Sequence, residues 1–484
     1  MDGTIERAEG LIKSGRLEDA LSALSGLLEA APDDARALMD LGVASHGLSR
    51  HGEAEAAFRR VLELDPSHRE ARKSLCMTLL AEGRKEECGE ALDSFAEGIG
   101  EDHASLAFAA TLYQALGRPC DAREHIDRAI GLAGFANHDE YRDLRAAISG
   151  LPKPSRLKYR PEVAVLCGRG MDSFIHGVAE AIAPYCTVRK TVGDHPSELL
   201  KGIAGAGTVW LEWGNQMTQA VLQQKERLRG KQVIVRIHSY EVIDGLVDRL
   251  DYSAVTDLVF VSSYIRDLFL AKGLKLPRAC RVHVVHNGID LCRFRPVPRG
   301  APSGRIAFLG HISYKKGPMV LAQAFAFLRR RHPEATLHVG GGFQDRRFEL
   351  AMRHFFDEAG LAEGAVLHGH VDDPGEWLRD KDYILCTSPV ESQGIGLLEA
   401  MSRGCRPLIF NFPGSSGIYL REHLWTTFDD LEERYLNPVG PAEASAFVAR
   451  HYSRDREAAS WLRILHGRET VVEDFGLNRT GAVH

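Results

Sequence analysis

Residues 382–404 read "DYILCTSPVESQGIGLLEAMSRG": a short apolar run, a loop with glycines, and then a longer apolar stretch. The first run predicts a buried strand that ends at Ser388, because it is short and rich in β-forming residues. The second stretch predicts a helix that begins near Gln393–Gly394 and is flanked by Gly404. A strand followed directly by a helix is the unit of a parallel sheet, so these residues decide the fold class.

Two glutamates lie eight positions apart here, Glu391 before the predicted helix and Glu399 inside it. The helix start at Gly394, Ile395 and Gly396 offers unpaired N–H groups and the positive end of the helix dipole, which favour a phosphate. That phosphate would repel Glu391, so we expect this side chain to reach hydroxyl groups to one side. Glu399 is placed to accept hydrogen bonds from a ribose diol. A phosphate between two hydroxyl-bearing groups indicates a nucleotide sugar.

The basic residues expected to bind the phosphate lie in "FLGHISYKKGP" at residues 308–318, directly after an earlier predicted strand. This turn holds His311, Lys315 and Lys316 ahead of the next predicted helix. A lysine at the diphosphate would stabilise the charge that builds on the leaving group as the glycosidic bond breaks. A solvated lysine pair at a helix start is the alternative interpretation, and the match between the two segments favours the phosphate turn.

Short β-branched runs alternate with helical stretches around these segments, which predicts βαβ units and parallel sheets buried on both faces. Prolines and glycines at 293–304 separate two such series. We therefore expect one lobe at 161–298, a donor-side lobe at 299–440 and helices at 441–484. Two doubly wound lobes place a ligand cleft between the carboxyl ends of their strands. The predicted fold class is α plus α/β.

A glycine-bearing loop, "GRGMDS" at residues 168–173, follows the first predicted strand of the first lobe. It lacks the third glycine of a dinucleotide-binding fingerprint, so we expect Gly168 and Gly170 to let the backbone approach the donor phosphates or the acceptor. Glu212, at the end of a later strand, is either a satisfied carboxylate or an acceptor contact. Asn287 and Asp290 in "HNGID" are expected to form a turn.

The first 136 residues repeat with a period of 34. Columns of small, basic, acidic and apolar residues share one register, and the small column consists of Ala20, Ala54, Cys88 and Ala122. The period and residue types resemble the tetratricopeptide repeat (TPR), a helix–turn–helix unit. The resemblance implies about four repeats and a capping helix over residues 1–150, followed by a linker at 151–160. We expect the groove to bind a protein or peptide; a spacer or dimerisation module is the alternative.

Residues 160–475 resemble the retaining GT-B glycosyltransferases that carry an E-x7-E motif (glycosyltransferase family 4-like). The resemblance rests on "VVHNGIDLCRF", "GHISYKKG" and "ESQGIGLLEAMSRG" in this order. It implies that Glu391 contacts sugar hydroxyls, that Glu399 binds the ribose and that Lys316 binds the diphosphate. His238 takes the place of a histidine that lines the reaction centre in these enzymes, or else it is a structural strand-end residue. No cofactor or metal is expected, because the helix start and the lysine meet the phosphate charge.

The implied reaction moves a sugar from a nucleotide-sugar donor to a hydroxyl acceptor with retention of configuration. An inverting variant would need a general base, for which Asp172 and His176 are the candidates. The family usually carries arginine where this chain has His311, and histidine is a weaker, pH-dependent phosphate partner. A TPR scaffold with a degenerate, non-catalytic GT-B module is therefore the alternative function.

The acceptor is less constrained than the donor. Repeats joined to GT-B lobes resemble bacterial protein glycosyltransferases that capture a target such as flagellin through the repeats. Recruitment to a complex that builds a cell-surface polysaccharide is the other interpretation. Neither the base nor the sugar of the donor follows from these residues.

The composition limits the classes of partner and the cellular location that we expect. A net charge of −6 and a pI near 6.4 argue against a nucleic-acid binder. Nine scattered cysteines without a CxxC motif indicate free thiols, so we expect a cytoplasmic protein. No apolar run approaches the ~18 residues of a spanning helix, which leaves peripheral attachment to a membrane surface open.

Overall fold

The computed structural model describes residues 2–133, 138–157 and 159–467 of the chain. The chain divides into two compact units, Met1–Arg156 and Leu157–His484. Among the residues described, no helix combines the length and the apolar character that crossing a membrane requires.

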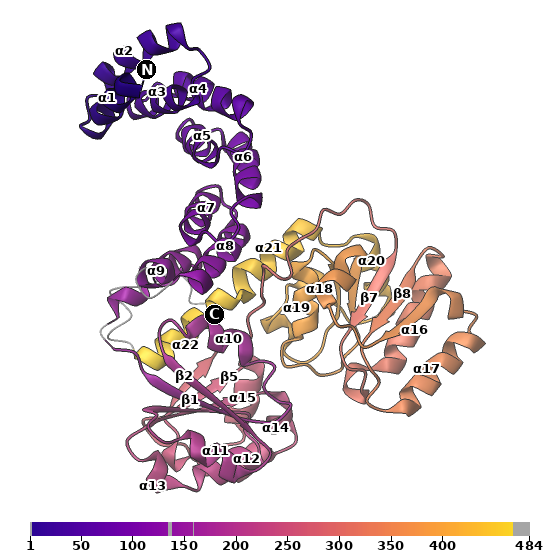
Figure 1. Cartoon of the computed structure of the whole chain (residues 1–484). Coiled ribbons are helices and arrows are strands. Elements are labelled where there is room, and N and C mark those ends of the chain that lie inside the picture. The colour runs from indigo at the N-terminus through magenta and orange to yellow at the C-terminus, as the bar shows by residue number, and fades with distance from the viewer. Residues whose placement is uncertain (1, 134–137, 158, 468–484) are drawn as a thin grey trace. The chain divides into compact units, whose positions relative to one another are not determined.

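The first unit is a row of helix pairs that follow one another along the chain, as the TPR resemblance predicts (Figure 1). The small residues of the 34-residue column are completely buried where paired helices cross, because larger side chains would push the helices apart. The helices are α1 (Asp2–Lys13), α2 (Leu17–Ala30), α3 (Ala35–Gly47), α4 (His51–Leu64), α5 (Arg69–Ala81), α6 (Lys85–Glu97), α7 (His103–Ala115), α8 (Pro119–Leu132) and α9 (His138–Ile148).

The turn inside each pair needs a residue with a left-handed backbone. Gly15, Gly83 and Gly117 supply it with φ of 77°, 75° and 74°. Only glycine adopts this conformation without a steric cost from Cβ. The second pair has Ser49 at the equivalent position, with φ of 60°.

The second unit contains two six-stranded parallel sheets, which confirms the predicted pair of α/β lobes. The first sheet has the order β2-β1-β3-β4-β5-β6, and its register pairs Val163 with Val188 and Thr208. Its interior strands are almost wholly buried, because helices cover both faces of a parallel sheet. The strands are β1 (Glu162–Gly168), β2 (Thr187–Gly193), β3 (Thr208–Glu212), β4 (Gln232–Ile237), β5 (Asp257–Phe260) and β6 (Arg281–Val284).

The second sheet has the order β12-β11-β10-β7-β8-β9, and Ile306 of β7 is in register with Tyr383 of β10. Its strands are β7 (Arg305–Leu309), β8 (Thr336–Gly340), β9 (Ala365–Gly369), β10 (Tyr383–Cys386), β11 (Arg406–Phe410) and β12 (Leu424–Trp425). The sequence did not predict β12, because two residues are too short to show an alternating pattern.

Helices connect the strands of both lobes (Figure 1). In the first lobe these are α10 (His176–Ile182), α11 (Pro196–Gly202), α12 (Gln216–Leu222), α13 (Lys225–Leu228), α14 (Ser239–Ile243) and α15 (Ser263–Ala271). In the second lobe they are α16 (Pro318–Arg331), α17 (Arg346–Glu358), α18 (Pro374–Trp377), α19 (Ile395–Ser402) and α20 (Phe428–Leu436).

The last two helices, α21 (Pro441–Tyr452) and α22 (Arg454–His466), connect the lobes. α21 packs against α19 of the second lobe, and α22 packs against α10 of the first. Trp461 of α22 stacks on Trp210 of β3, with ring centroids 3.6 Å apart. The end of the chain thus returns to the first lobe. Residues 468–484 of the expected C-terminal helices lie outside the described residues.

Candidate active site

The loops that carry the predicted residues leave the strands at which each sheet reverses its strand order. In the second lobe these are β7 and β10, which are neighbours although two strands separate them in the chain. In the first lobe they are β1 and β3, which lead into Gly168–Gly170 and into Glu212. Ligands of open α/β sheets bind at the carboxyl ends of such strands. The topology therefore brings four predicted segments to the cleft.

Lys316 and Glu391 lie in direct contact. Lys316 ends the short helix η5 (Tyr314–Lys316), and its Nζ forms an ion pair with Glu391 Oε1. Ser388 Oγ donates a hydrogen bond of 2.9 Å to the same oxygen. Burial alone would lower the pKa of the Lys316 ammonium, but the charge and the hydrogen bond of Glu391 outweigh it and raise that pKa. A cation thus stands at the phosphate turn, paired with the first glutamate of the motif.

Helix α19 begins at Ile395, directly after the loop that carries Glu391. Its N-cap is Gly394, with φ of 76°. A Cβ at Gly394 would lie 2.7 Å from Leu397 Cδ1 and 2.9 Å from Tyr419 Oη, so this position requires glycine. The N–H groups of the first turn and the dipole of α19 add positive potential next to the lysine.

Glu399 lines a cavity of about 190 Å³ together with Phe174 of the first lobe, Asp290 of the segment that joins the lobes (residues 285–304) and Arg454 of α22. Burial raises the pKa of the Glu399 carboxyl to about 7, although Arg293 and Arg454 act in the opposite direction. A carboxylate that its surroundings stabilise so little is well suited to accept hydrogen bonds from a ligand. The sequence predicts a ribose diol at this carboxyl.

His238 follows β4 and is held from several sides. Its Nε2 lies 2.9 Å from Glu212 Oε1, so this nitrogen carries a hydrogen toward the carboxylate. The ring stacks on Trp213 with centroids 3.8 Å apart. His238 and Glu241 form the capping box of α14. Glu212 also accepts a hydrogen bond of 2.9 Å from Trp210 Nε1, which favours the interpretation of Glu212 as a satisfied carboxylate.

The glycine loop of the first lobe is tied to the strand end that bears Glu212. Trp213 adopts φ of 75°, unusual for a residue with a side chain, and its Nε1 donates to Met171 O at 2.7 Å. Gly170 has φ of 74° in the same loop. Asp172 pairs with Lys190 at 3.0 Å, and this hydrogen bond lowers the pKa of Asp172. A carboxylate with a lowered pKa is a weak general base.

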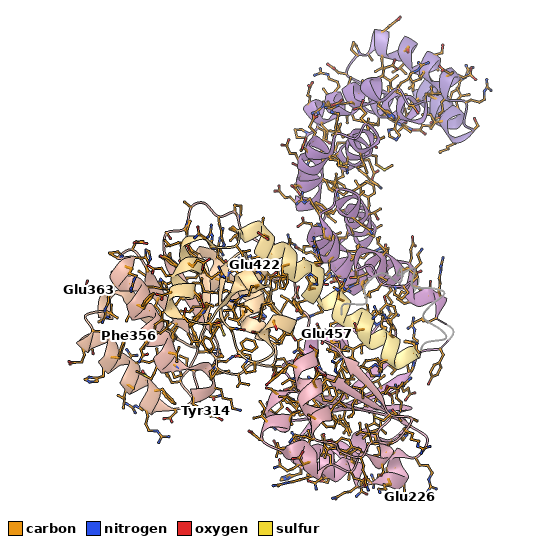
Figure 2. The ribbon with its side chains drawn as sticks, turned by 180° about the vertical axis from the view of Figure 1, so that it is seen from behind. Glu226, Tyr314, Phe356, Glu363, Glu422 and Glu457 are labelled. Carbon is orange, nitrogen blue, oxygen red and sulfur yellow. The ribbon has the colours of Figure 1, made fainter. Side chains whose placement is uncertain are left out.

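Two residues of the predicted phosphate turn do not join this group. His311 and Lys315 are exposed, whereas Lys316 points inward. Lys315 Nζ lies 6.0 Å from the ring centroid of Tyr240 in the first lobe. Tyr314 is 68% exposed at the surface (Figure 2). Lys316 is thus the cation that the structure places next to Glu391.

Sequence reasoning missed two residues beside Glu391. Ser392 Oγ donates to Ser239 Oγ at 2.6 Å and so joins the lobes at the cleft. Gln393 pairs through its side-chain amide with Asn287 of the segment that joins the lobes, at 2.8 and 2.9 Å. Their partners lie 153 and 106 positions away in the chain, so no local pattern pointed to them.

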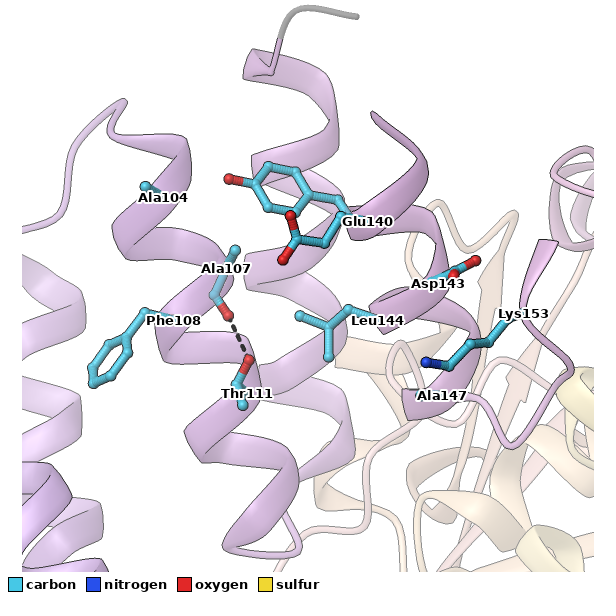
Figure 3. Close-up of a pocket in the computed structure, with 10 residues that line it drawn as sticks. Ala104, Ala107, Phe108, Thr111, Glu140, Asp143, Leu144, Ala147 and Lys153 are labelled. Atoms are coloured by element: carbon cyan, nitrogen blue, oxygen red, sulfur yellow. Dashed lines mark hydrogen bonds between the residues drawn. The ribbon is translucent and has the colours of Figure 1, made fainter. Parts of the chain in front are cut away.

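The repeat unit has a cavity of its own, of about 530 Å³, between α7 and α9. Figure 3 shows Phe108 and Leu144 at this cavity, with the carboxylate of Glu140 and the ammonium of Lys153 also at its wall. Small residues leave the space open. The lining consists of Ala104, Ala107, Phe108, Thr111, Glu140, Tyr141, Asp143, Leu144, Ala147 and Lys153.

Residues 298–423 match the family described as Glycosyl transferases group 1, and residues 5–69 match Tetratricopeptide repeat. A D-inositol 3-phosphate glycosyltransferase of Arthrobacter sp. (strain FB24) is 30% identical over 211 residues, which cover 38% of this chain and 50% of that protein. One of Jonesia denitrificans is 35% identical over 201 residues, which cover 36% of this chain and 47% of that protein. The chain spans about half the length of these curated relatives.

Among solved structures, Anabaena HepE in complex with UDP aligns with a TM-score of 0.52 at 14% identity. The alignment covers 63% of this chain and 99% of HepE. This likeness shows the fold. The chain therefore combines N-terminal tetratricopeptide repeats with a GT-B fold whose second lobe contains a glycosyl transferases group 1 domain.

Proposed function

We propose that this protein transfers a sugar from a nucleoside diphosphate donor to a hydroxyl group of an acceptor. The observation that carries the proposal is the convergence of Lys316, Glu391 and the start of α19 at one strand crossover, inside the glycosyl transferases group 1 domain. The curated relatives are glycosyltransferases, and about half the length of each aligns with this chain. Their similarity supports the same reaction class.

The donor diphosphate takes the place of Glu391 as the partner of Lys316. The ion pair keeps both charges satisfied before the donor arrives. When the diphosphate binds, the ammonium turns to it and stabilises the charge of the leaving group. Glu391 is then free to accept hydrogen bonds from hydroxyl groups of the transferred sugar. Glu399, in the second turn of α19, accepts hydrogen bonds from the ribose.

Transfer proceeds with retention at the anomeric carbon. The bond from this carbon to the diphosphate oxygen breaks, and a bond to the acceptor oxygen forms on the same face of the sugar. The proton of the acceptor hydroxyl passes to the leaving diphosphate. Because His238 donates through Nε2 to Glu212 and lies in a capping box, it lines the reaction centre as a ring of fixed orientation. Catalysis then rests on positioning and on charge stabilisation.

The full-length chain, incubated with UDP-glucose, UDP-N-acetylglucosamine and GDP-mannose, is expected to release nucleoside diphosphate from one of them. Lys316→Ala and Glu391→Ala should each lower that turnover by about 10²–10³-fold, as losses of transition-state stabilisation do. The matched control is Lys315→Ala, whose side chain is exposed beside the same turn. Wild-type turnover by both variants, or no turnover by the wild type with any of these donors, would contradict the proposal.

The stereochemistry has a separate test. NMR of the anomeric proton in the product is expected to show the configuration of the donor. The opposite configuration would require a general base in the first lobe, and the ion pair of Asp172 with Lys190 would then have to open.

The repeat unit binds the acceptor. Residues 1–156 contain 28 acidic and 19 basic residues, a net charge of −9, whereas the rest of the chain is net positive. Charge complementarity therefore favours a basic protein or peptide in the groove. A protein acceptor, of which flagellin is one example, or a protein of a complex that assembles surface glycan, fits this position.

A further inference from the structure

Gln393 connects the loop that carries Glu391 to the segment that joins the lobes. Its side chain is 1% exposed. Oε1 accepts a hydrogen bond of 2.8 Å from Asn287 N, and Nε2 donates one of 2.9 Å to Asn287 O. Asn287 Nδ2 adds a bond of 3.2 Å to the same Oε1. A side-chain amide that pairs with both polar groups of one residue fixes the distance and the orientation of the two segments.

The connection continues into the first lobe through a buried guanidinium. Asn287 Oδ1 accepts a hydrogen bond of 2.7 Å from Nη2 of Arg236, which lies in β4 and is completely buried. Arg236 Nη1 lies 3.6 Å from Glu212 Oε1, the oxygen that holds His238. Glu457 of α22, labelled in Figure 2, also accepts from Nη2 at 3.0 Å. Hydrogen bonds thus link the Glu391 loop to Arg236, and the 3.6 Å ion pair of Arg236 with Glu212 extends this connection to the carboxylate that holds the imidazole.

The buried Arg236 contributes more to the geometry of the candidate site than to the stability of the fold. Burial of a guanidinium between two carboxylates costs solvation, and apolar side chains of the same volume pack at least as well. Arg236 Nε and Nη1 have no hydrogen-bond partner among the described residues, which adds to that cost. The planar fork of arginine holds its partners at set angles, which lysine does not. Both ends of the connection are groups of the candidate active site.

We propose that Arg236 and Gln393 are positioning residues for the transfer reaction. They hold the Glu391 loop of one lobe and His238 of the other in the geometry that the transition state requires. The proposal rests on the proposed glycosyl transfer. Lys316, Glu399 and the start of α19, which bind the donor in the proposed function, all belong to the second lobe, so loss of the connection should affect the reaction step more than donor binding.

The test uses the full chain and the donor that the wild type turns over. Gln393→Met removes the amide and keeps the size; Arg236→Lys keeps the charge and loses the fork. Each is expected to lower kcat by about 10–100-fold, because small misplacements of reacting groups have effects of this size. The KM for the donor, and the Kd for UDP measured by calorimetry, should stay within about threefold. The double variant should be no slower than the slower single variant, because both act through one connection.

Ser402→Ala is the matched control. Ser402 Oγ donates a buried hydrogen bond of 2.9 Å from α19 to Phe294 O, so its loss disturbs the same helix but not the connection. Its kcat should equal that of the wild type. If Arg236→Lys does not fold, Asn287→Asp replaces it in the double variant, since it keeps the acceptor for Arg236 and loses the Nδ2 donor.

Three results would overturn the inference. Wild-type kcat in folded Gln393→Met would do so, as would equal losses of kcat and UDP affinity, or additive losses in the double variant. Absence of donor turnover by the wild type is a different result, because it would refute the proposed function itself.

Discussion

At the scale of single residues, the candidate site holds charges that are paired before any ligand binds. Lys316 and Glu391 satisfy each other, and Ser388 adds a hydrogen bond to the same carboxylate. A half-buried charge without a partner would be costly, so the pair keeps the empty site stable. Glu399 differs, because burial raises its pKa and no comparable partner lowers it.

The proposed contact of Glu399 with the ribose predicts that nucleotide binding depends on pH. With a pKa of about 7, the carboxyl is mostly protonated at pH 6 and mostly ionised at pH 8. Two ribose hydroxyls are bound best by the ionised form, so binding lowers this pKa and releases a proton. The affinity for UDP is therefore expected to rise between pH 6 and pH 8, by up to about tenfold. Calorimetry in buffers of different ionisation enthalpy measures both the affinity and the proton release.

Glu399→Gln provides the control for this prediction. The amide cannot ionise, so the pH dependence of the UDP affinity should flatten and no proton from this group should be released. Equal pH profiles for the variant and the wild type would show that another group titrates. Because burial raises the pKa of its carboxyl, Glu399 also contributes less to stability as pH rises through 7.

At the scale of elements, helix α19 owes its start to Gly394. The residue combines a left-handed backbone with close contacts on the side where Cβ would stand. The loop before it is held at three points, by Lys316, by Ser239 and by Asn287. The helix N-terminus is therefore placed by contacts with segments that are distant in the sequence.

Gly394→Ala tests two requirements at this position, the left-handed backbone and the lack of space for a Cβ. A side chain at positive φ costs about 1–2 kcal/mol, and contacts of 2.7 and 2.9 Å add to it, so we expect a loss of about 2 kcal/mol or more. Gly230→Ala is the matched control, since Gly230 has φ of 73° with nothing within 4 Å of a Cβ, and should lose about 1 kcal/mol. Urea unfolding followed by circular dichroism measures both. Equal losses would mean that the contacts around Gly394 relax at no cost.

At the scale of the whole molecule, the proposed function assigns a different ligand class to each compact unit. The GT-B unit couples its lobes through α22, whose Trp461 and Glu457 contact the first lobe. The repeat unit carries its own cavity and a net negative charge. Separate sites on separate units predict that acceptor capture and donor activation can be changed independently.

Ala104→Arg tests this independence. Ala104 is exposed and lines the cavity between α7 and α9, so an arginine there would fill the space and repel a basic partner. Capture of proteins by the full chain, read by mass spectrometry, is expected to lose the partners that the wild type retains. Donor hydrolysis should stay at the wild-type rate.

Ala56→Arg is the control, because Ala56 is exposed on α4 and does not line the cavity. It adds the same charge to the same unit. Loss of capture by both variants would point to net charge rather than to the cavity between α7 and α9. Unchanged capture by Ala104→Arg would exclude this cavity as the docking site.

Much of this architecture is local, and the sequence by itself determined it. The 34-residue period predicts the helix pairs because small residues recur wherever helices cross. Alternating strand and helix patterns predict both parallel sheets, since buried strands need continuous apolar runs. The prediction of a phosphate site at the loop before α19 also rests on local features, namely glycines, a helix start and nearby lysines.

Contacts between distant segments were decided only by the tertiary structure. Lys316 meets Glu391 across 75 positions, Gln393 meets Asn287 across 106, and Arg236 meets Glu457 across 221. A polar residue in a sequence carries no sign of which partner will satisfy it once it is buried. That choice depends on how strands are ordered and helices packed, because hydrogen bonds form between groups that folding brings within about 3 Å. The same reason explains why the sequence pointed to His238 but not to the connection that holds it.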